Sequence, residues 1–421
     1  MPQNPVPEFA RRIGRVRPSA IRELLRLGDD PTITSFGGGY PDPALFPVDD
    51  LHEIYDRLLT REHALSLQYT ASTGLPALRE QIAERMTADG MPCTADDILV
   101  IQGGQQGLDL CGRLVLDPGD VVVTENPTFL GALIAFNPCE PRYAAVPVDA
   151  QGMDTDALEQ VLTDLAAGST RSGSSAGSMG SAHSGGGRAR LLYTIPDFQN
   201  PSGVTMSLER RQRLIELANR HNLLVVEDTP YRSLRYEGHH LPTLKSLDTE
   251  GRVVHLGSFS KILAPGMRLG WALARPEILG PLGLLKLAAD TQCSTLNMAA
   301  TSAYLAAHDI DVHIGAMCTA YRAKRDTMLA TLEARFPADV SWTRPEGGLF
   351  TWVTFPEGFD TAAFMRDHAL PRARVAYVPG ATFFPVTEQP RHARFSFSNS
   401  THEEIVRGIT ALGDLLRETA A

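Results

Sequence analysis

The sequence predicts an α/β protein with two domains: a large domain with a mostly parallel, seven-stranded sheet flanked by helices, and a smaller α+β domain. Between about residues 97 and 274, short apolar runs alternate with helical stretches, which is the pattern of parallel α/β sheets. After residue 275 long helical stretches take over, and three strand-like runs follow them. A chain of 421 residues also exceeds one ordinary domain, so a division into two is expected.

The composition narrows the class of protein. Hydrophobic residues make up 43% of the chain and charged residues 21%, as in soluble globular proteins. The formal charge of −10 argues against non-specific nucleic-acid binding. No apolar run approaches the ~20 residues of a membrane span, and residues 1–17 lack the apolar segment of a secretory signal. The five cysteines form no CxxC pair, disulfide framework or metal site, which favours a reducing cytoplasm.

The first part of the chain is expected to form an N-terminal arm and part of the small domain. Residues 1–20 are rich in Pro and Arg and predict an extended arm that ends at Ser19, a helix N-cap. The apolar stripe that follows leaves Arg22 off the buried face. Residues 37–42 form a glycine-rich loop whose backbone a ligand can approach closely. We therefore assign residues 1–48 to an arm and part of the small domain, 49–290 to the large domain, and 291–421 to the small domain.

The individual elements follow from the apolar patterns. The seven strands of the large domain are predicted at residues 98–101, 121–123, 143–146, 191–195, 223–226, 253–256 and 269–274. Helices are predicted at residues 51–59, from about 78, from 103, and at 127–136 and 208–219. In the small domain we predict strands at 348–355, 374–378 and 392–397, and helices at 361–368 and 402–416. Residues 168–187 hold 14 Gly or Ser among 20 and predict a flexible surface insertion.

The segment after the strand at 253–256 carries the strongest chemical signal. It contains Ser258, Ser260, Lys261 and Arg268, and ligands of open α/β sheets bind beyond the carboxyl ends of the strands. A partly desolvated lysine beside another cation favours its neutral amine and can add to a carbonyl. A hydroxyl and an arginine suit a phosphate. Pyridoxal phosphate requires this combination, although a surface lysine and arginine on an ordinary loop would look the same.

Other strand ends supply matching groups. Gly103, Gly104 and Gln105 open a helix whose free N–H groups suit a phosphate. Asp228 can pair with a protonated ring nitrogen, Asn200 and Tyr231 can hydrogen-bond a phenolic oxygen, and Phe129 can stack on the ring. Each residue also has an ordinary structural interpretation, as a turn, cap or core residue. Their joint occurrence at successive strand ends is what favours a cofactor site.

With these motifs the sequence resembles the fold-type I pyridoxal-phosphate aminotransferases of class I/II. The resemblance is strongest to the branch of 2-aminoadipate (kynurenine) aminotransferases and the aminotransferase-like half of MocR-type regulators. The stretches that carry it are 19–23, 38–42, 69–79, 103–106, 125–128, 196–203, 227–231, 258–268 and 394–398. They run through nearly the whole chain, outside the Gly/Ser insertion. In that family a hydroxyl residue often stands at the position of Gly104, and tyrosine often stands at that of Phe129.

The resemblance implies roles for the cofactor-binding residues. Lys261 would hold pyridoxal 5′-phosphate as a Schiff base and, once released, shuttle a proton. Asp228 would pair with the pyridine nitrogen, while Asn200 and Tyr231 would contact the 3′-oxygen. Tyr69 would reach the phosphate of the other subunit, which implies a homodimer with shared sites.

The resemblance also implies a substrate site. Arg394 would bind the substrate α-carboxylate, helped by Asn200 and the Gly39 backbone. Arg22 matches the position that meets the distal end of the substrate in the 2-aminoadipate branch, and a solvated helix arginine is the alternative. Tyr40 would line the pocket for the side chain.

The expected activity is a ping-pong aminotransferase reaction between an amino acid and a 2-oxo acid. Glutamate and 2-oxoglutarate are the expected amino pair, with an aromatic, branched-chain or 2-aminoadipate-like partner. One alternative is a decarboxylase, lyase or oxidase that uses the same cofactor. Another is a MocR-like effector-binding module, which we disfavour because the arm starting at residue 1 leaves no room for a helix-turn-helix region.

Overall fold

The centre of the protein is an eight-stranded sheet in the order β2-β9-β8-β7-β6-β3-β4-β5. The computed structural model describes residues 8–16, 30–171 and 188–420. The strands are β2 (Ile98–Ile101), β3 (Val121–Asn126), β4 (Arg142–Asp149), β5 (Gly152–Met153), β6 (Ala189–Thr194), β7 (Leu224–Asp228), β8 (Val253–Ser258) and β9 (Gly270–Leu273). Neighbours from β8 through β4 are parallel, whereas β9 is antiparallel to both its neighbours and β5 to β4. The seven predicted strands are confirmed; β5 was missed because two residues leave no apolar pattern.

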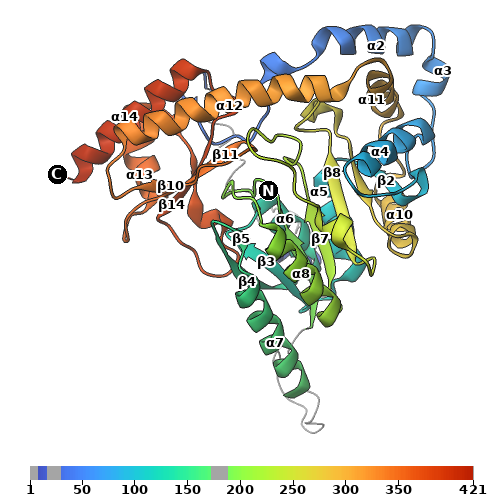
Figure 1. Cartoon of the computed structure of the whole chain (residues 1–421), viewed down its shortest axis with the longest axis horizontal. Helices are drawn as coiled ribbons and strands as arrows, with labels where there is room; N and C mark the ends of the chain where they lie inside the picture. The colour runs from blue at the N-terminus through green and yellow to red at the C-terminus, as the bar shows by residue number, and fades with distance from the viewer. Residues whose placement is uncertain (1–7, 17–29, 172–187, 421) are drawn as a thin grey trace, which may run out of the picture.

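Helices cover both faces of this sheet (Figure 1). One face packs against α5 (Gly104–Val115), α6 (Leu130–Phe136) and α10 (Pro276–Asp290), and the other against α7 (Thr155–Arg171) and α8 (Leu208–His221). Successive strand residues serve the two cores in turn, as Val226 and Val225 do. Because both faces are buried, the strands appear in the sequence as continuous apolar runs.

A helical layer lies beside β2 at one end of the sheet. It is formed by α2 (Val48–Thr60), α3 (His63–Ser66), α4 (Pro76–Ala88) and α11 (Thr295–Ala307). Buried residues of α4, such as Leu78 and Ile82, share one apolar core with Ile98 and Val100 of β2. In the described part of the chain, no helix is long and apolar enough to cross a membrane.

A second, smaller sheet has the order β10-β11-β14-β13 and is antiparallel throughout. Its strands are β10 (Ser341–Trp342), β11 (Phe350–Thr354), β13 (Val378–Pro379) and β14 (His392–Ser396). The 26-residue helix α12 (Ile310–Arg335) runs from the helical layer to this sheet and packs against α14 (His402–Ala420) (Figure 1). The parallel pair of β1 (Thr34–Ser35) and β12 (Val375–Ala376) joins the N-terminal segment to the same unit.

The remaining described elements are short. They are η1 (Arg11–Arg15), η2 (Pro43–Leu45), η3 (Ala95–Asp97), η4 (Asn137–Cys139), α9 (Leu244–Leu247), η6 (Pro265–Met267), α13 (Thr361–Phe364), η7 (Met365–Ala373) and η8 (Gly380–Phe383).

Several predicted boundaries were wrong. The helix predicted at 127–136 starts at Leu130, because Phe129 is extended and the Thr128 N–H donates to Phe383 O. The single strand predicted at 374–378 is two short ones, β12 and β13, which pair with different partners. The helix predicted at 361–368 ends as α13 at Phe364 and continues as the π-helix η7.

Two further predictions concern the N-terminal arm and the Gly/Ser segment. The arm predicted to be extended forms the 3₁₀ turn η1 at Arg11–Arg15, where Ile13 N donates to Ala10 O and Arg11 pairs with Glu140. The predicted N-cap at Ser19 and the helix after it lie outside the described residues. Residues 168–171 of the predicted Gly/Ser insertion belong to α7, which extends to Arg171, and its residues 172–187 lie outside the described part.

Candidate active site

The carboxyl ends of β6, β7 and β8 carry several of the predicted site residues. Asp228 and Ser258 are the last residues of β7 and β8, and Lys261 follows three residues after Ser258. Asn200 lies in the turn after β6, with a cis peptide bond to Pro201. Parallel neighbours end at the same edge of a sheet, so a polar site forms there.

The Lys261 amine contacts the glycine-rich loop of residues 37–42. Its Nζ donates a hydrogen bond to Gly39 O at 2.7 Å, so the glycine-rich loop closes one side of the site. Burial, with the positive charges of Arg394 and Arg268, lowers the pKa of Lys261 to about 8. The amine therefore reaches its neutral, nucleophilic form at a lower pH than an exposed lysine.

Asp228 presents a buried carboxyl group to the site. Burial raises the pKa of Asp228 to about 6, although the Tyr193 hydroxyl and the nearby His255 act in the opposite direction. Tyr193 Oη donates to Asp228 Oδ2 at 2.9 Å. Tyr193 was not predicted as a site residue. The β6–β7 register pairs Tyr193 with Val226, which lies two residues before Asp228 and therefore on the same face of the sheet. This spacing of two residues is the sequence pattern that could have identified Tyr193.

Arg394 and Asn200 form a second polar centre. Arg394 Nη1 donates to Asn200 Oδ1 at 2.8 Å and Nη2 to Gly37 O at 2.7 Å, while Asn200 Nδ2 lies 3.3 Å from the Tyr231 hydroxyl. The guanidinium stacks over the Phe350 ring at 4.2 Å. Its Nε is buried without a hydrogen-bond partner in the described structure. Burial lowers the pKa of Arg394 to about 10.

Arg268 and the start of α5 form the end of the site that suits an anion. Arg268 Nη2 donates to Gln102 O at 3.0 Å, and Ser258 Oγ accepts from Ser260 N at 3.1 Å. Gly103 precedes α5 with φ of 71°, and a Cβ there would lie 3.1 Å from Arg268 Nη2. Glycine therefore suits the backbone conformation, and a side chain there would crowd the guanidinium.

The other predicted site residues are more dispersed. Phe129 immediately precedes α6 and its ring lies against Gly131. The Gln105 side chain donates to Gly131 O at 2.8 Å. The group of Gln105 that remains for the predicted phosphate contact is its backbone N–H. Tyr69 is 81% exposed and Tyr40 46% exposed. Arg22 lies outside the described residues.

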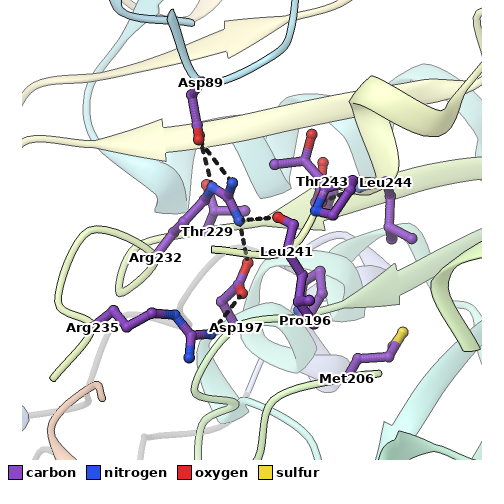
Figure 2. A network of polar contacts seen from close by, with 12 residues as sticks. Asp89, Pro196, Asp197, Met206, Thr229, Arg232, Arg235, Leu241, Thr243 and Leu244 are labelled. Carbon is purple, nitrogen blue, oxygen red and sulfur yellow. Dashed lines mark hydrogen bonds and ion pairs between the residues drawn. The ribbon is translucent and has the colours of Figure 1, made fainter. Parts of the chain in front are cut away.

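A buried ion cluster around Asp197 supports the turns of the site (Figure 2). Arg211 Nη2 lies 2.8 Å from Asp197 Oδ1, Arg232 Nη1 3.2 Å from Oδ2, and Arg235 Nη2 3.8 Å from Oδ1. Although burial alone would raise the pKa of Asp197, the guanidinium groups lower it below its ordinary value. Arg232 follows Tyr231 and Asp197 lies three residues before Asn200, so the cluster joins the two turns. The arginine partners were not predicted, because they are distant in the sequence.

Glu125 is a further buried acid beside the same turns. Its carboxylate accepts from Thr194 Oγ1 at 2.6 Å and from Gln199 Nε2 at 3.1 Å. Burial raises its pKa to about 7. Gln199 precedes Asn200, so Glu125 fixes the turn from β3. Among the described residues, no group of three or more His, Cys, Asp or Glu could hold a metal ion.

Comparison with known proteins places this geometry in context. The family model "Aminotransferase class I and II" matches residues 46–412. The aromatic-amino-acid aminotransferase 1 of Thermococcus litoralis is 39% identical over 411 residues, covering 97% of this chain and 94% of that protein.

Two solved structures are similar over nearly their whole length. Kynurenine aminotransferase from Pyrococcus horikoshii, in complex with PMP, superposes with a TM-score of 0.89 at 36% identity, covering 98% of each chain. The α-aminoadipate aminotransferase LysN from Thermus thermophilus, complexed with N-(5′-phosphopyridoxyl)-L-leucine, has a TM-score of 0.87 at 35% identity, again covering 98% of each chain.

Proposed function

The chain belongs to the aminotransferase class I and II family, and we propose that it moves an α-amino group between an amino acid and a 2-oxo acid by a ping-pong mechanism. An aromatic, branched-chain or 2-aminoadipate-like amino acid is the proposed substrate, and glutamate with 2-oxoglutarate is the proposed amino pair. The observation that carries this proposal is one lysine, Lys261, beyond the end of β8, whose pKa is lowered to about 8 by burial and by the positive charges of Arg394 and Arg268. The named relatives, which act on aromatic, kynurenine and α-aminoadipate substrates, support the substrate class.

Pyridoxal 5′-phosphate is the proposed cofactor, and the residues present fit it. The Lys261 amine, the Asp228 carboxylate and the Arg268 guanidinium offer an imine-forming group, a partner for a ring N–H and an anion partner. The PMP and phosphopyridoxyl groups of the two solved relatives support this choice. When bound, the cofactor supplies an aldehyde for the amine and a ring that accepts electrons from the substrate α-carbon.

The chain's own residues would position the cofactor and move the proton. Lys261 would bind the cofactor and, when released from it, carry a proton to and from the substrate α-carbon. Its lowered pKa favours that role near neutral pH. Asp228 would hold the ring nitrogen, and Asn200 with Tyr231 would hold the phenolic oxygen. The phosphate group would lie among Gly103, Gly104, Gln105, Ser258, Ser260 and Arg268, with Phe129 against the ring.

Arg394 would hold the substrate α-carboxylate. Because the buried Nε has no hydrogen-bond partner among the described residues, this guanidinium has a donor to spare, and Arg pairs with carboxylates in a bidentate geometry. Asn200 accepts one of its hydrogen bonds, and the Gly39 carbonyl accepts one from Lys261. Tyr40 and Arg22 would face the substrate side chain.

We further propose a homodimer in which Tyr69 completes the site of the partner subunit. Tyr69 is exposed, and so are the apolar side chains of Leu65 and Leu67 near it in sequence and of Leu284 and Leu287 on α10. Exposed apolar surface of this kind marks protein interfaces. A shared interface would bury these side chains.

The two sheets are the basis for the proposed domains. Residues 49–290 would form the large domain, and residues 1–48 with 291–421 the arm and small domain. The β1–β12 pair supports placing the N-terminal segment with the second unit. We propose a cytoplasmic location, since all five cysteines are free thiols.

One spectroscopic experiment tests the proposed function. The purified holoenzyme would be mixed with single amino acids, without an acceptor, while the absorbance of the cofactor is followed. Loss of the yellow band, reversed by 2-oxoglutarate, is the expected result, and the amino acids that cause it are the donors. Release of carbon dioxide or hydrogen peroxide instead would contradict the aminotransferase proposal and favour the decarboxylase or oxidase alternative.

A further inference from the structure

The two oxygens of Asp228 face different surroundings. Oδ2 accepts the hydrogen bond from Tyr193 at 2.9 Å. Oδ1 faces the start of α5, where a Cβ built on Gly104 would lie 3.7 Å away in ordinary van der Waals contact. One oxygen is thus held by the protein, and the other is directed toward the end of the sheet where the cofactor is proposed to bind.

Tyr193 is itself rigidly placed. Its side chain is fully buried in β6, between β3 and β7, and its ring packs edge-on against Phe136 with centroids 5.9 Å apart. A phenol in that position cannot rotate away to another environment without disturbing the sheet core. Its hydroxyl therefore acts as a fixed donor to the carboxylate.

The hydrogen bond from Tyr193 is one of two interactions that favour the ionised form of Asp228. The other titratable groups facing it are Glu125 on β3, His255 on β8, Cys111 on α5 and Tyr231 in the following turn. Of these, His255 favours the ionised carboxylate of Asp228. Glu125 is an acid, and a second negative charge would repel that carboxylate. A buried carboxylate without donors takes up a proton instead of staying ionised.

We propose that Tyr193 is a positioning residue: its hydroxyl keeps Asp228 ionised and holds Oδ1 toward the pyridine nitrogen of the bound cofactor. This inference rests on the role proposed above for Asp228. The proton on the ring nitrogen would then be held by an anion whose orientation is set from β6. Loss of the hydroxyl removes the donor but keeps the ring that fills the core.

The test compares two ligands of the cofactor-free protein: pyridoxal 5′-phosphate, and an analogue in which a C–H group replaces the ring nitrogen. Tyr193→Phe is expected to weaken binding of pyridoxal 5′-phosphate about tenfold, the effect of one hydrogen bond to a charged group. It is expected to leave binding of the analogue unchanged, because the analogue has no nitrogen for Asp228 to hold. Equal losses for both ligands would indicate a merely structural role and overturn the proposal.

Two further variants sharpen the comparison. Tyr143→Phe is the matched control, because the Tyr143 hydroxyl contacts Asn137 and Leu133 O and not Asp228; neither affinity should change. Asp228→Asn should weaken pyridoxal 5′-phosphate selectively, and adding Tyr193→Phe to it should have no further effect. If Asp228→Asn changes nothing, the role proposed for Asp228 is wrong. If it weakens binding and Tyr193→Phe does not, only the inference about Tyr193 is wrong.

A second route covers the case in which Tyr193→Phe does not fold. Fluorotyrosine placed at position 193 keeps the hydroxyl and makes it a stronger donor. Tighter binding of pyridoxal 5′-phosphate, with unchanged binding of the analogue, is the expected result. Unchanged binding of both would contradict the proposal.

Discussion

Arg394 donates a hydrogen bond to Asn200 Oδ1 at 2.8 Å, joining β14 of the smaller sheet to the turn after β6 of the larger sheet. The same guanidinium also donates to Gly37 O, so one side chain connects three segments that are distant in the sequence. The proposed carboxylate site therefore forms only when both sheets and the N-terminal loop are in place.

The first prediction concerns this guanidinium. Arg394→Lys should raise KM for amino acids roughly 100-fold, because an ammonium cannot make the paired hydrogen bonds of a guanidinium. Arg391→Lys is the control, since Arg391 lies three residues away, is half-buried and pairs only loosely with Glu357 at 3.7 Å. Steady-state kinetics with each donor would measure both. Similar KM values for the two variants would contradict the assigned role.

The second prediction concerns pH and Lys261. The folded pKa of about 8 lies below the value of 10.5 of a free lysine, so between pH 8 and 10.5 the unfolded chain binds more protons than the folded one. The stability of the cofactor-free protein should therefore gain a contribution as pH rises through this window. Urea unfolding of wild type and Lys261→Met across this range would show it, with the contribution absent in the variant. Identical pH profiles would rule out the lowered pKa.

The third prediction tests the shared site with hybrid dimers. A hybrid of one Lys261→Ala subunit and one Tyr69→Ala subunit has one intact site if Tyr69 serves its partner, and none if it serves its own chain. Co-expression with two different tags would isolate the hybrid. We expect its activity to exceed that of both parent homodimers, whereas activity no higher than theirs would place Tyr69 in its own subunit's site or outside the site.

The fourth prediction concerns the Asp197 cluster. Asp197→Asn should destabilise the protein by about 3–5 kcal/mol, because it leaves buried guanidinium groups without their shared carboxylate. Asp367→Asn removes an exposed pair with Arg366 and should cost less than about 1 kcal/mol. Urea unfolding of the holoenzyme would compare them. A small loss for Asp197→Asn would mean that water or other acceptors replace the carboxylate.

The fifth prediction distinguishes the effect of backbone strain on stability from an effect on cofactor binding at the proposed phosphate site. Gly103→Ala and Gly119→Ala both place a side chain at positive φ and should each cost about 1–3 kcal/mol of stability. Only Gly103→Ala crowds Arg268, since a Cβ at Gly119 has open space. Titration with pyridoxal 5′-phosphate should therefore show weaker binding for Gly103→Ala alone. Equal affinities would remove Arg268 from the proposed phosphate site.

Much of the architecture could be predicted because the strands of a buried parallel sheet appear in the sequence as nearly continuous apolar runs. The run 98–101 is apolar at every position and 253–256 at all but His255, and the polar residues that follow such strands must lie at one edge of the sheet. That is why the sequence alone groups Asp228, Ser258 and Lys261.

What escaped prediction depends on long-range contacts. Tyr193 looks like any core residue of a strand until the fold brings its hydroxyl to Asp228 on the neighbouring strand. Arg211, Arg232 and Arg235 look like surface arginines until they meet around Asp197. The π-helix η7 and the strand β5 are set by packing and leave no periodic pattern.

The Asp197 cluster also constrains how this sequence can change over time. Three arginines share one carboxylate, so replacing any single member leaves the others in a worse environment than before. An apolar version of the cluster is reachable only through intermediates that are less stable than either end state. The four positions are therefore expected to vary together in descendants of this chain, and the turns carrying Asn200 and Tyr231 inherit that constraint.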